Sequence, residues 1–212
     1  EAKAGWLKSG AYSGAWGPAK ALITVEDGAG FDWAGKVDNS TATPYSFKVA
    51  GTGPDGSGAM MTSADFGGTF YNINSIADLE LDGDATFRLH QTVLNMYGFM
   101  FNNLNNHVLK LNSHTLTVVV WDSFPFQNVT SAGAGTIVCV PDESKEGGLR
   151  RLSFYGAPSD LSGVTLDVHD RCGLNVEDNV KVLNFIDRRT LQWNDGTKDN
   201  NGFTTDKDSI DG

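Results

Sequence analysis

Three observations in the sequence predict an all-β fold, and within that class a parallel β-helix, a solenoid whose coils have roughly 24–32 residues. Apolar and polar residues alternate with period two in short segments along the chain, while the periodicity of an amphipathic helix is almost absent. Clusters of Gly, Asn and Asp follow these segments and mark turns. The strand and turn units recur at similar intervals, which indicates a repeat architecture.

Several segments alternate clearly enough to be predicted as half-buried strands. They cover residues 22–26, 45–49, 77–81, 107–111, 136–140 and 164–168. Turn residues follow these segments, and two of them resume after the turn as second short strands at 85–89 and 115–118. Phe124 and Phe126 alternate within another short segment and are expected in the core.

The spacing of these units favours a solenoid. The last apolar residues before successive corners are Val25, Val49, Leu81, Leu111, Val140 and Val168. The first interval between them is the shortest, and the later ones are similar to one another. A propeller blade needs four strands in about 40 residues, which is more than these units hold, whereas a coil of two or three short strands fits. A β-sandwich remains the alternative because the spacing is uneven.

Three regions are expected along the chain. Residues 1–20 are predicted as an N-terminal cap or an incoming coil, residues 21–190 as the β-helix coils, and residues 191–212 as an acidic polar tail. The 16 Lys and Arg against 26 Asp and Glu give a formal net charge of −10, which disfavours nucleic acids and anionic membranes as partners. No apolar run approaches the roughly 20 residues of a transmembrane helix.

Particular runs of residues resemble a known group of proteins. Residues 49–59, 79–85, 109–118 and 133–138 resemble the repeats of autotransporter-like and pectin-lyase-like right-handed β-helix proteins of bacterial surfaces. The resemblance covers about residues 20–185 and implies a right-handed β-helix in a secreted or cell-surface bacterial protein. It implies either an adhesin or an enzyme that acts on polysaccharides. The Asn-Thr-Asp, Gly-His-Gly and Arg-x-Pro-x-x-Arg elements of the enzymes are missing from this chain.

The favoured hypothesis is a non-catalytic domain, a fragment of a larger exported protein, that binds a glycan or a host surface protein in adhesion. A polysaccharide lyase or glycoside hydrolase and a structural stalk are the alternatives. The acidic residues Asp78, Glu80, Asp82 and Asp84 keep the enzyme alternative open, although no catalytic residue is assigned. The open coil ends of a truncated solenoid also predict end-to-end self-association.

Aromatic side chains are the first candidates for ligand binding. Trp33 and Trp121 lie near expected junctions of strands and loops, and Tyr155 is a third candidate. Exposed rings on the side of a solenoid can stack on sugars, whereas rings that point inward belong to the core. These three residues are therefore predicted to contact a glycan.

The C-terminal segment offers the only candidate metal ligands. Asp199, Asn201, Asp206 and Asp208 supply oxygen ligands around a glycine turn, as calcium requires. The competing interpretation is a solvated acidic tail. Calcium is the one cofactor that the sequence suggests.

The coil spacing also leads to predictions for two further pairs of residues. Cys139 and Cys172 are separated by little more than one coil, which leaves open both a disulfide and two separate buried thiols. His114 and His169 are expected at equivalent corners, where polar side chains of successive coils would stack.

Overall fold

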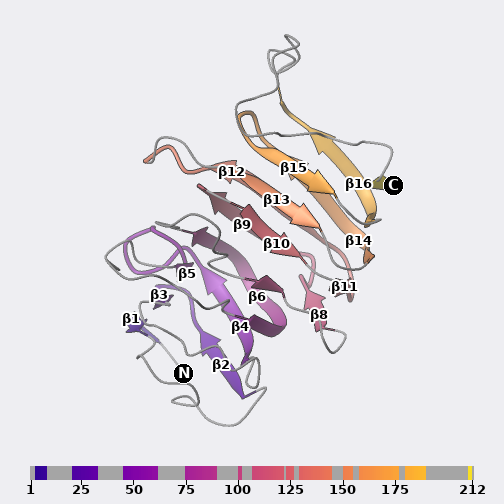
Figure 1. Cartoon of the computed structure of the whole chain (residues 1–212). Coiled ribbons are helices and arrows are strands. Elements are labelled where there is room, and N and C mark those ends of the chain that lie inside the picture. Colours follow the sequence, from indigo (N-terminus) through magenta and orange to yellow (C-terminus); the bar gives the residue numbers. More distant parts are fainter. Residues whose placement is uncertain are drawn as a thin grey trace.

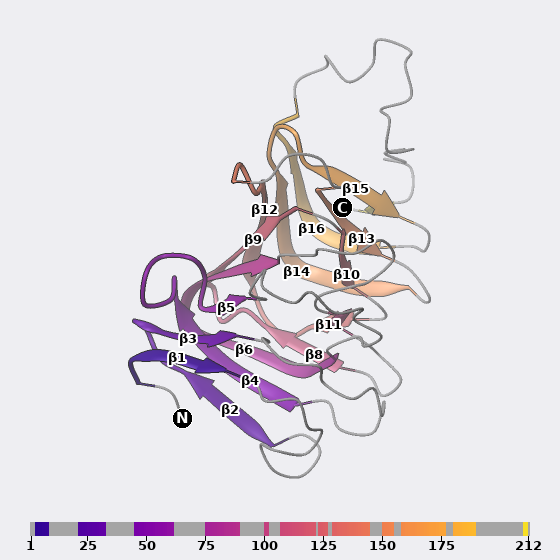
Figure 2. The same ribbon diagram turned by 60° about the vertical axis from the view of Figure 1, so that its left-hand side comes forward.

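The structure, a computed structural model, describes residues 3–8, 21–32, 45–61, 75–89, 100–101, 107–121, 123–126, 129–144, 150–154, 158–176, 180–189 and 210–211. These residues form strands and connecting turns, with no helix among them, and all their strands belong to one 17-stranded sheet. The strands follow one another in chain order, from β1 and β2 at one end to β15 and β16 at the other (Figures 1 and 2). The predicted all-β class is confirmed.

The strand bounds are as follows. The first nine strands are β1 (Gly5–Lys8), β2 (Leu22–Val25), β3 (Ala29–Asp32), β4 (Tyr45–Gly51), β5 (Met60–Met61), β6 (Ser75–Leu89), β7 (Met100–Phe101), β8 (His107–Lys110) and β9 (Thr115–Val120). The others are β10 (Ser123–Phe126), β11 (Val129–Ser131), β12 (Gly135–Pro141), β13 (Arg151–Phe154), β14 (Ser159–Val168), β15 (Gly173–Val176), β16 (Val180–Asp187) and β17 (Ile210–Asp211).

Every pairing between the described strands is parallel, and the pairings form three rows. Row A contains β2, β4, the part of β6 around Leu79 and Glu80, β8, β11, the starts of β14 and β16, and β17. Row B contains β1, β3, β5, the end of β6, β9, β12 and the ends of β14 and β16. Row C contains Ser75 and Ile76 at the start of β6, and then β7, β10, β13 and β15. The long strands β6, β14 and β16 therefore cross from row A into row B.

The register confirms the first predicted spacings and corrects the later ones. Val49 pairs with Val25 on one side and with Leu81 on the other, as the first two intervals predict. Val140, however, pairs with Val119, and it is Cys139 that pairs with Val168. The prediction failed there because Leu111 ends a strand of row A whereas Val140 ends a strand of row B.

One apolar interior serves all three rows. A single buried cluster contains side chains from row A such as Phe47, from row B such as Phe87, and from row C such as Phe154. Phe124 and Phe126 are fully buried, as predicted. Phe126 stacks on Phe154 with ring centroids 5.0 Å apart. Alternation of side chains along each strand places the intervening polar residues on the outer surface.

The corners between rows depend on left-handed backbone conformations. Asn112 and Ser113 have φ angles of 52° and 66° at the corner between β8 and β9, and the Asn112 amide donates a hydrogen bond to the Leu81 carbonyl at 2.9 Å. Asn is one of the few residues that tolerate this region. Gly53 has a φ of 83°, and a Cβ atom there would collide with the Gly58 carbonyl. A side-chain hydrogen bond thus stabilises the corner at Asn112, and close backbone packing restricts the corner at Gly53 to glycine.

Both terminal segments contribute a strand. Within residues 1–20, β1 pairs with β3, and within residues 191–212, β17 pairs with β16. None of the described segments forms a helix that is long and apolar enough to cross a membrane.

Candidate functional site

All six arginines of the chain lie where strands of row B end and strands of row C begin. They are Arg88, Arg150, Arg151, Arg171, Arg188 and Arg189. Arg88 is near the end of β6, Arg150 precedes β13 and Arg151 is its first residue. Arg171 lies in the turn before β15, and Arg188 and Arg189 follow β16. We call this row of residues the arginine edge. It holds six of the 16 basic residues of a chain with net charge −10.

Strand alternation and tight turns position these side chains. In β14, Leu166 and Val168 point into the core, and the intervening Asp167 faces outward. The chain then turns sharply, with the Cys172 N–H donating to the His169 carbonyl at 3.1 Å. Arg171 has a φ of 62° within this turn, so its side chain leaves a corner rather than a strand.

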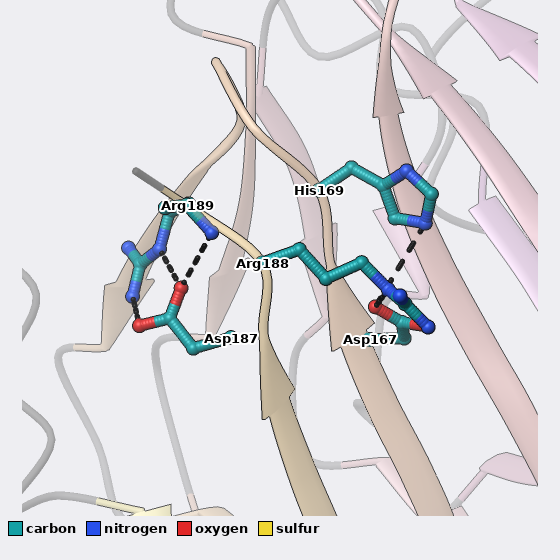
Figure 3. Close-up of polar contacts among 5 residues, drawn as sticks. All are labelled: Asp167, His169, Asp187, Arg188 and Arg189. Atoms are coloured by element: carbon teal, nitrogen blue, oxygen red, sulfur yellow. Dashed lines mark hydrogen bonds and ion pairs between the residues drawn. The ribbon is translucent and has the colours of Figure 1, made fainter. Parts of the chain in front are cut away.

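Asp167 is the centre of the best-defined polar cluster on this edge (Figure 3). Its two carboxylate oxygens accept hydrogen bonds from Nε and Nη2 of Arg188 at 2.7 and 2.8 Å. His169 Nε2 lies 3.8 Å from the same carboxylate. The Asp167 side chain is 8% exposed, whereas Arg188 and His169 are 54% and 41% exposed. A nearly buried anion therefore holds two accessible side chains in place.

This contact also fixes the charge on Arg188. The hydrogen bond and the charge of Asp167 raise the pKa of Arg188 above its ordinary value. A guanidinium has five N–H donors, and the contact with Asp167 uses two of them. An arginine oriented in this way can bind a carboxylate or sulfate group with its other donors.

A second ion pair closes the end of the apolar interior. Asp187 pairs with Val168 in the row of inward-facing residues that contains Cys139. Its carboxylate accepts two hydrogen bonds of 2.7 Å from the Arg189 guanidinium. Figure 3 shows the contact between Asp187 and Arg189, whose side chains are 20% and 12% exposed, so we regard this pair as structural.

Two more arginines are tied to acidic residues that follow β12. Arg88 Nη1 donates to Asp142 Oδ1 at 3.1 Å, and the Asp142 side chain is fully buried. Arg171 Nη1 donates to Glu143 Oε2 at 2.6 Å, but these side chains are 48% and 61% exposed. Arg171 and Arg188 are thus accessible cations, whereas Arg88 holds a buried corner.

Trp121 is the one predicted ligand-binding aromatic residue that the structure describes. It is half-buried at the end of β9, and its carbonyl accepts a hydrogen bond from the Arg150 N–H at 3.2 Å. It therefore belongs to the same edge as the arginines. Trp33 and Tyr155 lie outside the described residues, as do all four predicted calcium ligands, Asp199, Asn201, Asp206 and Asp208. In the part of the chain that is described, no group of three His, Cys, Asp or Glu residues could hold a metal ion.

The acidic residues that kept the enzyme alternative open contact other groups. Asp78 accepts a hydrogen bond from the Val108 N–H at 3.0 Å, and Asp84 accepts one from the Thr115 N–H at 2.8 Å. Glu80 lies 3.7 Å from Lys110. Asp82 forms a 2.8 Å ion pair with Lys48, whose pKa is raised by the hydrogen bond from its ammonium group to Asp82. These contacts join neighbouring strands.

The histidines are not at equivalent corners. His114 lies between β8 and β9, where row A meets row B, whereas His169 lies after the row B part of β14. The expected stacking of these two residues is therefore wrong. Sequence reasoning missed the arginines because no local motif marks them: Arg88, Arg171 and Arg188 lie within three residues of the end of a row B strand, whereas the end of β9 has no arginine near it in the sequence. Comparison of the chain with protein-family models, curated proteins and solved structures finds no match.

Proposed function

We propose that this chain is a right-handed parallel β-helix domain of an exported surface protein, and that it binds an acidic glycan along the arginine edge without catalysis. The parallel pairing in three rows supports the β-helix, because a β-sandwich is built from antiparallel sheets. The single buried cluster shared by all three rows supports it further. Right-handed crossover between parallel strands is the general rule.

The observation that carries the proposed ligand is the position of the arginines. A chain with net charge −10 repels anions over most of its surface, yet every arginine lies on one edge. Neighbouring strands in a row are about 4.8 Å apart, so side chains from successive strands form a line that suits a linear polymer. Arg171, Arg188 and His169 are accessible there, and Trp121 offers a ring for stacking on a sugar.

The acidic cluster does not favour the enzyme alternative. A glycosidase needs one carboxyl group as a proton donor and a second as base or nucleophile, on opposite sides of one bond. Glu80 and Asp82 are instead paired with lysines of neighbouring strands, while Asp78 and Asp84 accept backbone hydrogen bonds. We therefore assign the cluster to the cohesion of β6 with its neighbouring strands.

A glycan array that contains uronic-acid, sulfated and neutral glycans tests the proposal, with a reducing-sugar assay on the same panel. We expect the domain to retain uronic-acid or sulfated glycans, to lose them as salt is raised, and to release no sugar. Binding of neutral glycans alone would contradict the acidic ligand. Release of sugar would favour the enzyme, and silence on every glycan would favour a stalk or a protein partner.

Matched charge variants locate the site. The double variant Arg171→Gln/Arg188→Gln should bind at least about tenfold more weakly, because each charged hydrogen bond contributes about 1.5–3 kcal/mol. The control Lys110→Gln/Lys181→Gln removes the same charge from row A and should bind as the original chain does. Since Asp167 loses its partner in the double variant, Arg171→Gln alone is also measured. Equal losses in the control and the double variant would refute a site on the arginine edge.

A further inference from the structure

The only two cysteines of the chain lie next to one another inside the core. Cys139 is fully buried on β12, and Cys172, in the turn before β15, is 4% exposed. Both are free thiols in this structure. They come from segments that are well separated in the chain, yet the Cys139 thiol is close enough to Cys172 for that residue to affect its ionisation.

Backbone hydrogen bonds hold this arrangement. Cys139 pairs with Val168 on β14, and its carbonyl accepts a hydrogen bond from the His169 N–H at 3.0 Å. The His169 carbonyl in turn accepts one from the Cys172 N–H at 3.1 Å. Cys172 is thus one tight turn from the strand neighbour of Cys139. The alternation of β12 directs the Cys139 side chain inward, to the side where Cys172 is buried.

The surroundings make both thiols poor reactants once the chain has folded. Burial raises the pKa of the Cys139 thiol well above its usual range, and the hydrogen bond with Cys172 raises it further, against a smaller opposing effect of Arg189. Thiolate is the nucleophile in disulfide exchange. The Cys139 sulfur is therefore a poor nucleophile, and reagents in solution reach the two buried sulfurs poorly.

We propose that Cys139 and Cys172 form an intramolecular disulfide when the chain folds in an oxidising compartment, so that β12 is linked covalently to the turn before β15. The oxidant is a small-molecule disulfide such as oxidised glutathione. One cysteine thiolate attacks it, which forms a mixed disulfide and releases one glutathione thiolate. The second cysteine thiolate then attacks the protein sulfur of the mixed disulfide and releases the other glutathione. Two protein thiols are oxidised, one glutathione disulfide is reduced to two thiols, and the cysteine protons go to solvent and to the glutathione thiolates.

The timing of this step follows from the burial. Exchange occurs while the later strands are still docking, because the folded core excludes the oxidant. Once formed, the disulfide is shielded from reductants by the same core. A bond between two segments that are separated by more than one coil also restricts the unfolded chain, which stabilises the folded state.

The experiment refolds the full chain in a glutathione redox buffer and, separately, in dithiothreitol. We expect the oxidised monomer to lack two hydrogens by mass spectrometry and to resist alkylation after denaturation, while the reduced monomer takes up two alkyl groups. The oxidised form should melt about 10 °C higher than the reduced form. Cys172→Ala should melt at one temperature in both buffers.

Three results would overturn the proposal. They are two alkylatable thiols after oxidative refolding, dimers on a non-reducing gel in place of a cross-linked monomer, and equal melting temperatures for the two forms of the original chain. The mass and alkylation measurements use the unsubstituted protein, so the proposal stays open to refutation even if Cys172→Ala fails to fold.

Discussion

Replacement of Arg88 by methionine tests how much a buried ion pair contributes to the corner after β12. Arg88 Nη1 donates to Asp142 Oδ1 at 3.1 Å, and its Nε donates to the Ser57 carbonyl at 2.8 Å. The Arg88 side chain is 24% exposed and that of Asp142 is fully buried. Methionine keeps the aliphatic part of the side chain and removes both donors, so the Asp142 carboxylate stays buried without this cation.

The expected loss is large. Removal of one partner from a buried ion pair costs about 3–5 kcal/mol. Ser144 continues to donate to the same carboxylate oxygen from its N–H at 3.0 Å and its hydroxyl at 2.6 Å. We therefore expect the lower end, about 3 kcal/mol of the free energy of unfolding. The midpoint of thermal unfolding should fall by about 6–12 °C in a chain of this size.

Denaturant and thermal unfolding of four proteins measure this effect as a double-mutant cycle. In the Asp142→Asn background the same Arg88→Met substitution should cost about 2 kcal/mol less, because no buried carboxylate is left behind. Lys110→Met is the matched control. Its partner Glu80 is 3.7 Å away, the side chains are 51% and 38% exposed, and the expected change is below about 1 kcal/mol.

Two outcomes would refute this reasoning. One is an Arg88→Met protein that is as stable as the Lys110→Met control. The other is an equal cost of Arg88→Met with and without the Asp142 carboxylate, which would show that the ion pair does not couple the two side chains.

Two further predictions concern the core and a surface turn. Phe126→Ala should lower the free energy of unfolding by about 4–5 kcal/mol, because the ring is fully buried and stacked on Phe154. The control Leu22→Ala changes a side chain that is 62% exposed and should alter the free energy of unfolding by less than about 0.5 kcal/mol. Similar losses for the two variants in urea unfolding would contradict the assignment of the core. The Ser57 hydroxyl and N–H lower the pKa of Asp55, so Ser57→Ala should raise that pKa toward 3.8 in an NMR titration. A carboxyl group whose pKa is lowered by folding stabilises the fold at pH values above its unfolded-state pKa, and this stabilisation is lost in acid. The Ser57→Ala variant should therefore be less stable than the original protein at neutral pH and equally stable below the folded-state pKa of Asp55. An unchanged Asp55 titration would contradict the role of Ser57.

The alternation of single residues made the strands predictable. In residues 79–81 the two leucines are buried and Glu80 lies at the surface, as period-two alternation requires. The first intervals were also correct because Val25, Val49 and Leu81 occupy the same position in row A. The end of the row B strand β9 was missed, so that Leu111 of row A was compared with Val140 of row B, because β10 of row C follows β9 after a corner of only two residues. Such a corner leaves no turn signature that separates one row from the next.

The arginine edge could not be predicted from the local sequence. Arg88 and Arg171 lie far apart in the chain and share no motif. Only the strand register shows that both lie close to the end of a row B strand. The spacing of Cys139 and Cys172 left open a disulfide and two separate buried thiols; both are buried free thiols in this structure, and the disulfide stays a proposal. The predicted residues Trp33 and Tyr155 and the four tail ligands stay predictions, because they lie outside the described residues.

The ion pair of Asp187 and Arg189 makes the β16 end of row B chemically different from the rest of the row. Earlier strands of row B carry Phe87, Val118 and Val168 at one inward position. At the same position β16, the last described strand of row B, carries Asp187, whose carboxylate is held by the Arg189 guanidinium. A second molecule that extended row B from this end would have to bury that charged pair against its own apolar side chains. Inward-pointing charges are one of the means by which proteins prevent strands from adding at a sheet edge. Addition of a further strand to the row B part of β16 would therefore be costly.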